Sequence, residues 1–273
     1  MLRKGDLTQG GITGTLLHFT LPMMVGSFLQ QCYNIADTLI VGQCIGAGAL
    51  AAVGSAYTLM VFLISVLLGL AMGSGTVFSL HYGAGNHVAL RRSIFSSFVL
   101  IGIVTLILNV AVFIWLDPIL RLLQVPQDIY GMMRSYSWII FCGIVFTFIY
   151  NFYASLLRAV GDSVTPLWFL AVSVVLNIAL DLFFILQLDW GIQGAAAATV
   201  LAQGVAALGI IIYTYRRRPE LRWHHEDMCF DRTCLKEIAS FSTLTCVQQS
   251  VMNLGILMVQ GVSLIHISEP TRH

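Results

Sequence analysis

The stretch LPMMVGSFLQQCYNIADTLIVG, residues 21–42, decides the fold, because it is long and apolar enough to cross a bilayer and yet contains one acid, Asp37. A charge at membrane depth costs about 2.5 to 3.5 kcal/mol on insertion scales, so an acid kept there marks a functional site by default. Gln30, Asn34 and Asp37 are spaced i, i+4 and i+7 and share one helical face. We predict that this polar stripe points into a helix bundle. The simpler interpretation, that Asp37 only anchors the helix at the headgroup boundary, stays open.

The composition is that of an all-α polytopic membrane protein. The chain has 273 residues, 58% hydrophobic and only 10% charged, whereas soluble domains are about 25% charged. Apolar runs near 20 residues, which a hydrocarbon core of about 30 Å requires, predict six complete spans and the start of a seventh. These spans lie at 15–42, 51–81, 94–116, 134–157, 166–187, 193–215 and 237–262.

The basic residues predict the orientation. Eleven Lys and Arg side chains lie before the first span or in the loops after the second, fourth and sixth spans, all on the same side of the membrane as the N-terminus. Only Arg121 and Arg134 lie in the loops on the opposite side. Because cytoplasmic loops carry the excess of Lys and Arg, we expect a cytoplasmic N-terminus in the cell (plasma or inner) membrane.

The domain organisation follows from one hydrophilic linker, 216–236, which separates a six-helix bundle, 1–215, from the seventh span, 237–262. Shifted by 218 positions, Gln30 and Gln31 fall on Gln248 and Gln249 at the start of that span. The echo suggests that a second bundle begins there, as in transporters built from parallel repeats. Chance similarity between two apolar helices is the alternative.

A second intramembrane acid appears in VSVVLNIALDLFFI, where Asn177 and Asp181 are one helical turn apart. On the predicted topology, Asp37 and Asp181 lie at similar depth, and Thr199 lies early in the inward-running sixth span. The four residues can therefore meet in one cavity. Two carboxylates in low dielectric repel, so one must hold a proton or share a cation, and this requirement is itself a coupling mechanism for H+ or Na+. The blander interpretation is that the acids only fix helix packing.

The cysteine and histidine residues do not predict a metal site. His224, His225, Cys229 and Cys234 stand in the linker, but their spacing fits no closed zinc pattern. We expect no metal and no cofactor beyond the coupling ion.

The chain resembles the MATE family, the multidrug and toxic compound extrusion transporters. The likeness is carried by the stretch 21–42, by ALAAVG at 49–54, LLRAVGDSVTP at 156–166, LNIALDLFFI around Asn177 and Asp181, and GIQGAAAATVLAQ at 191–203. The resemblance implies two six-helix bundles that export amphipathic organic cations in exchange for H+ or Na+. It also implies that Asp37, Asn177, Asp181 and Thr199 bind the coupling cation. We expect no enzyme activity, no nucleic acid and no obligate protein partner besides the bilayer.

The length departs from the family pattern, because most of the second bundle is missing. The tail 263–273, SLIHISEPTRH, reads like the in-frame translation of a sequencing adapter. We therefore expect native sequence to end near Val262, and the chain to be a fragment that is inactive alone.

Two other functions are alternatives for a membrane protein with these features. Flippases for lipid-linked saccharides have a related architecture but would line their cavity with Arg or Lys, and none lies deep in the six spans. An intramembrane aspartyl protease would use Asp37 with Asp181 or with Asp162 of the Gly161-Asp162 pair. However, Ala159 replaces the first glycine of the GxGD pattern that such enzymes have.

Overall fold

A computed structural model describes residues 12–122, 125–223 and 232–268 of the chain. Within these residues every regular element is helical. The elements are α1 (Ile12–Cys44), α2 (Ala47–Gly83), α3 (His87–Leu122), α4 (Gln127–Cys142), α5 (Ile144–Ala159), α6 (Val164–Leu182), the π-helical turn η1 (Phe183–Gln187), α7 (Gly191–Arg217), the 3₁₀ turn η2 (Pro219–Leu221) and α8 (Arg232–Ser268).

Each of the seven predicted spans overlaps a helix, and the all-α polytopic fold is confirmed. Among the described residues, four helices are long and apolar enough to cross a membrane, namely α2, α3, α6 with its π turn, and α7, whereas α1 and α8, which cover the first and seventh predicted spans, are not among them. The fourth predicted span is not one straight helix but a pair, α4 and α5, bent by 46° at Gly143, and it supplies a fifth span if counted as one. The predicted linker is also shorter than expected, because α7 reaches Arg217 and α8 begins at Arg232.

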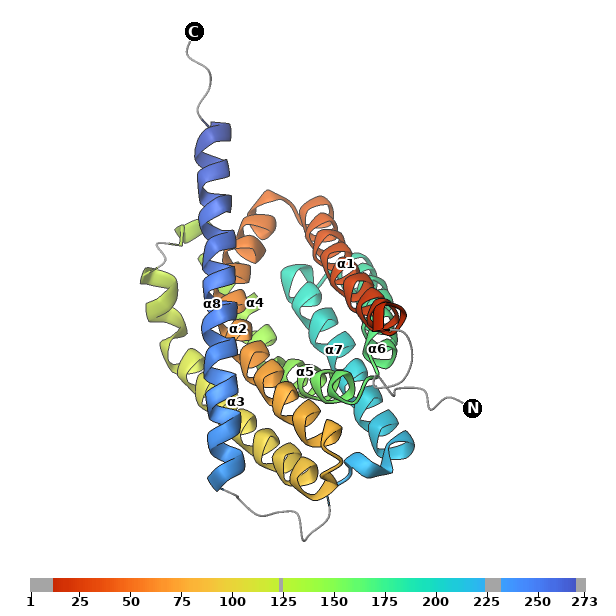
Figure 1. Cartoon of the computed structure of the whole chain (residues 1–273). Helices are drawn as coiled ribbons and strands as arrows, with labels where there is room; N and C mark the ends of the chain where they lie inside the picture. Colours follow the sequence, from red (N-terminus) through yellow and green to blue (C-terminus); the bar gives the residue numbers. More distant parts are fainter. Residues whose placement is uncertain (1–11, 123–124, 224–231, 269–273) are drawn as a thin grey trace.

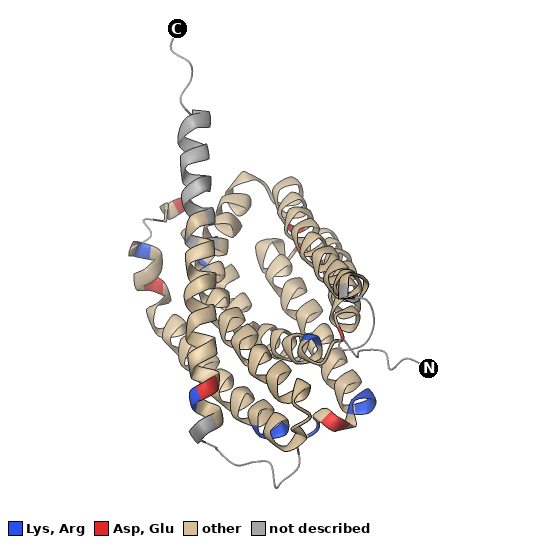
Figure 2. Cartoon of the chain, viewed as in Figure 1, with Lys and Arg blue, Asp and Glu red and all other residues tan. Residues whose placement is uncertain are grey.

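The helices form two groups around α2. Figure 1 shows α1 packed beside α6 and α7, while α8 stands on the other side of the bundle along α2 and α3. The buried core between them is apolar and aromatic, with Phe98 in ring contact with Phe148 and Phe152. Figure 2 shows that the Lys and Arg residues gather towards the ends of the helices. A charged residue inside the bundle is therefore an exception that needs a physical reason.

The contact between α2 and α8 depends on two glycines. A Cβ atom on Gly69 would lie 2.6 Å from Cys246 Cα, and one on Gly73 would lie 2.4 Å from Ser242 Cα. Such small residues let two helix backbones touch, which is how membrane helices commonly associate. The Ser242 hydroxyl then reaches the Leu70 carbonyl oxygen at 3.3 Å. The four-residue spacing of Gly69 and Gly73 thus serves close packing of α2 against α8.

Helices α6 and α7 form a hairpin whose connection is irregular. The end of α6 widens into the π turn, in which Phe184 stacks on Trp190 with ring centroids 5.1 Å apart. Asp189 adopts a φ of 51°, a conformation uncommon outside glycine. The turn directly follows Asp181, and π-helical turns often occur at functional sites.

Gly73→Ala tests the close approach of α2 and α8. The added methyl group would collide with the α8 backbone, so we expect a loss of about 1 to 3 kcal/mol in the free energy of unfolding. Gly54→Ala is the matched control, because a Cβ there meets nothing within 4 Å, and it should be neutral or stabilise the helix by up to about 1 kcal/mol. Thermal unfolding of both variants in detergent measures the difference; equal effects would contradict the packing.

Candidate cation-binding site

Three helices bring the predicted site residues together inside the bundle. Asp37 comes from α1, Asn177 and Asp181 come from successive turns of α6, and Thr199 comes from α7. Asn177 and Asp181 are fully buried, Thr199 is 6% exposed and Asp37 is 9% exposed. Buried acids are rare because ionised carboxylates are costly to remove from water. The sequence-predicted quartet is thus one structural cluster.

Asn177 is the residue that joins α6 to α7. With its amide nitrogen towards Asp181, it donates to Asp181 Oδ2 at 3.0 Å, and its oxygen accepts from the Thr199 backbone N–H at 3.3 Å. The opposite orientation would turn the amide oxygen towards the carboxylate, which repels it, so the neighbours select the first orientation. The cluster therefore depends on the axial register between the two helices.

The two acids lie together without full compensation. The carboxyl groups of Asp37 and Asp181 are within hydrogen-bonding reach of each other. Among the described residues, Asp37 Oδ1 and Asp181 Oδ1 have no hydrogen-bond partner. A bare pair of ionised carboxylates is unfavourable at this depth, so a shared proton or a bound cation has to offset the repulsion. The oxygen atoms of Asp, Asn and Thr side chains are also the ligands that hard cations prefer.

Two tyrosines belong to the cluster and were not predicted from the sequence. The Tyr33 hydroxyl donates to Thr199 Oγ1 at 3.3 Å. Tyr136 of α4 is buried and lies within electrostatic range of Asp37 and Asp181. Tyr33 stands one helical turn before Asp37, a spacing that would have identified it. Nothing in the sequence around Tyr136 distinguishes it from an ordinary core tyrosine.

The predicted supporting residues do not join the cluster. Gln30 is exposed, and Asn34 donates to Gln31 Oε1 at 3.1 Å rather than to an acid. A supporting role for Gln30 and Asn34 stays a prediction.

A small cleft reaches the cluster at Thr199. It lies between α2, the bend from α4 to α5, and α7, and its polar lining comes from Thr147, Thr199 and Gln203. Thr147 Oγ1 and Gln203 Oε1 are hydrogen-bonded to each other. Since Gln203 is one turn beyond Thr199 on α7, these groups extend the polar surface of the site away from the acids.

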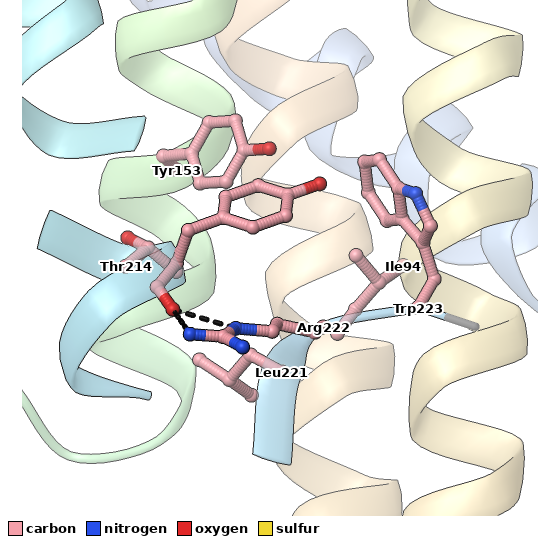
Figure 3. A pocket seen from close by; sticks show the side chains of 7 residues that line it. Ile94, Tyr153, Thr214, Leu221, Arg222 and Trp223 are labelled. Atoms are coloured by element: carbon pink, nitrogen blue, oxygen red, sulfur yellow. Dashed lines mark hydrogen bonds between the residues drawn. The ribbon is translucent and has the colours of Figure 1, made fainter. Parts of the chain in front are cut away.

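A second, separate surface depression lies where α7 ends, next to α3 and α5. Figure 3 shows Arg222 at its edge, hydrogen-bonded to a backbone carbonyl, with Tyr153 and Trp223 forming its walls. That carbonyl belongs to Tyr215, and the distance from Arg222 Nε is 2.6 Å. The depression contains no acid and is not part of the cation site.

The other candidate residues lie elsewhere. Asp162 stands two residues before α6 begins, and its carboxylate accepts from the Thr165 backbone N–H at 3.0 Å. It is therefore far along the helix from Asp181, and the predicted protease pairing of Asp162 with Asp37 is not formed. Of the linker residues, His224, His225 and Cys229 fall outside the described part, and Cys234 is buried 3.6 Å from Ser93 Oγ. The described residues contain no cluster of metal-binding side chains.

Fold and site together define a polytopic all-α membrane protein with a buried acid pair between three helices. The model of the MatE family matches residues 22–183. The chain is 36% identical over 217 residues to the probable multidrug resistance protein YpnP of Bacillus subtilis (80% of this chain, 49% of the relative). It is 31% identical over 210 residues to the multidrug export protein MepA of Staphylococcus saprophyticus (74% and 45%). The chain belongs to the MATE family of transporters.

A solved structure supports the fold. The outward-facing conformation of a multidrug resistance MATE family transporter of the MOP superfamily superposes with a TM-score of 0.88 at 24% identity, over 97% of this chain and 58% of that chain. The chain thus spans about half the length of the curated relatives it matches.

Asp181→Asn tests the acid pair, since it keeps the shape of the side chain but removes its charge and its proton. We expect the purified chain to bind H+ or Na+ at least about 10-fold more weakly, with Asp37→Asn behaving alike. Infrared titration of the buried carboxyl groups and binding of radioactive sodium would measure this. Gln30→Ala is the control and should bind like the wild type, because Gln30 lies outside the cluster. Unchanged binding in both acid variants would remove them from the site.

Tyr33→Phe removes one hydroxyl that donates to Thr199. A net hydrogen bond is worth about 0.5 to 1.5 kcal/mol, so cation affinity should fall roughly two- to tenfold, less than for either acid. The same titration compares it with Tyr57→Phe, a control on an exposed tyrosine of α2. A Tyr33→Phe variant indistinguishable from Tyr57→Phe would show that the hydroxyl has no part in binding.

Proposed function

We propose that the protein to which this chain belongs is a multidrug efflux antiporter, which exports amphipathic organic cations in exchange for H+ or Na+. In this proposal the chain contributes the coupling site and half of the transport path, and does not transport alone. The relatives named as multidrug resistance and export proteins support the substrate class, and the share of their length that the chain covers supports the division of labour.

The observation that carries the proposal is the buried pair of Asp37 and Asp181. Its partners are neutral side chains, and the ion pairs formed by the described residues involve other acids, at Asp117, Asp162, Glu220 and Glu237. A buried pair of acids with no basic partner among the described residues can take up and release a proton or a small cation. If a larger organic cation competes for the same charge, its binding and the binding of H+ or Na+ are coupled, and a gradient of H+ or Na+ can then drive the exchange.

The charge of the bundle argues against the flippase alternative. A carrier of lipid-linked pyrophosphates needs cations in its cavity, whereas Arg134 pairs with Asp117 at the end of α3, with Nε 2.8 Å from Oδ1. The acids at the site suit a cationic cargo instead. The protease alternative is weakened by the position of Asp162, and membership of a transporter family points to no enzyme activity. Asp37 and Asp181 would still suit water activation if a model transmembrane peptide were cleaved.

Transport of a fluorescent organic cation into everted vesicles is the direct test. Sequencing the source locus past the codon for Val262 tests whether the reading frame continues, and a longer product, where one is found, should accumulate the dye when a proton or sodium gradient is imposed. Because the acid pair is the coupling site, Asp37→Asn and Asp181→Asn in that product should reduce gradient-driven uptake to the level of empty vesicles.

Two controls define this experiment. Cys234→Ser should transport like the wild type, since Cys234 lies away from the site, and the chain of 273 residues alone should insert but not accumulate dye. Full uptake by both acid variants would refute the coupling role. Transport by the short chain would refute the proposed division of labour and point to assembly of two copies.

A further inference from the structure

The loop between α5 and α6, within the segment LLRAVGDSVTP, contributes no residue to the cation site or to a protease site. Its backbone ends α5 with two hydrogen bonds, from Gly161 N–H to the Arg158 oxygen at 3.0 Å and from Asp162 N–H to the Leu157 oxygen at 2.9 Å. Gly161 adopts a φ of 86°, which a side chain would oppose. This pattern is a Schellman termination, and it delivers the Asp162 side chain to the start of α6.

Asp162 then bonds to two helices at once. Its carboxylate accepts from the Thr165 backbone N–H at 3.0 Å and from the Thr165 hydroxyl at 2.8 Å, both in the first turn of α6. It also accepts from Arg218 Nη2 at 3.4 Å, directly after the end of α7. The side chains of Asp162 and Arg218 are only 12% and 20% exposed. The pair is therefore screened less by water than a surface ion pair.

The arrangement is electrostatically complementary to the helix ends. The N-terminus of a helix carries partial positive charge and its C-terminus partial negative charge. Asp162 places its negative charge at the first turn of α6, and Arg218 places its positive charge at the last turn of α7, where its own N–H donates to the Thr214 oxygen at 3.0 Å. Each charge thus stabilises its own helix end, and together they clamp the two ends side by side.

The clamped helices are the two that must keep register at the cation site. Asn177 and Asp181 lie on α6 and Thr199 lies on α7, and the hydrogen bond from the Thr199 N–H to Asn177 crosses between them. At the other end of the hairpin, the π turn and the stacked rings of Phe184 and Trp190 join the helices. The ion pair between Asp162 and Arg218 joins the two helices at the end of the hairpin away from the π turn.

From this geometry we infer that Asp162, acting through Arg218, is a positioning residue for the cation site. It holds the register of α6 against α7 and so sets the distance between the Asp181 carboxyl group and Thr199. This inference rests on the proposed function, because the pair of Asp162 and Arg218 is inferred to influence the cation affinity of the coupling site. It assigns Asp162 no contact with the transported ion.

The test measures cation affinity in the purified chain. Asp162→Asn keeps the acceptor for the Thr165 N–H but loses the charge, and Arg218→Gln removes the other half of the pair. Each should weaken binding of H+ or Na+ about 3- to 10-fold, a typical effect for residues coupled to a site at a distance. The double variant should be no weaker than either single variant, because the two residues act as one unit. Arg218→Lys keeps the charge and should restore most of the affinity.

Arg217→Gln is the matched control, since it removes the same charge at the neighbouring, exposed position of α7. It should bind like the wild type. For proton affinity, Arg218→Gln is the informative variant, because it leaves every carboxyl group in place for infrared titration. Should Asp162→Asn lose helical circular dichroism, Arg218→Gln and Arg218→Lys carry the comparison.

The outcomes separate the two proposals. A wild-type chain that binds neither H+ nor Na+ at the acid pair would refute the proposed function. A wild-type chain that binds, together with pair variants that bind equally well, would overturn the positioning role alone. Equal losses in Arg217→Gln and Arg218→Gln would also overturn it, because any charge at that end of α7 would then suffice.

Discussion

The structure depends on two carboxyl groups that have to coexist inside a bundle of apolar helices. Among the described residues, Asp37 and Asp181 have only neutral partners in their buried environment, so a proton or a cation, rather than one of these partners, relieves their repulsion. This constraint explains why an amide, a hydroxyl and two tyrosines surround them. Each of these groups supplies a dipole or a hydrogen bond without adding a charge of its own.

The helices that carry the acids differ from those that build the wall. Helices α1, α6 and α7 bring polar groups inward, and their contacts are specified by hydrogen bonds between side chains. Helices α2 and α8 meet instead through glycine and serine, where backbone contact and dispersion hold them. The polar contacts between α1, α6 and α7 set the geometry of the site, whereas the close packing of α2 and α8 stabilises the bundle around it. The site thus lies in the part of the bundle where register matters most.

Membership of the MATE family and the geometry of the cluster both support the proposed coupling. The family match covers α1 from Pro22 and continues to Phe183, so it includes both acids. The two acids are far apart in the sequence but close in space, because α1, which carries Asp37, packs against α6, which carries Asp181. A site assembled in this way responds to any movement of α1 against that hairpin. That response is the physical basis on which ion binding and conformation can be linked.

Much of this protein was determined by the sequence alone. Long apolar runs require helices because no water is present in the bilayer to satisfy the backbone, and two acids with Asn177 and Thr199 in such runs predict a site because buried acids are costly. Tertiary structure decided the rest. The bend at Gly143, the inclusion of Tyr136, the exposure of Gln30 and the pairing of Asp162 with Arg218 all depend on which helix lies beside which. Hydropathy and periodicity report the environment of a residue along its own helix, whereas these features arise from partners far away in the chain.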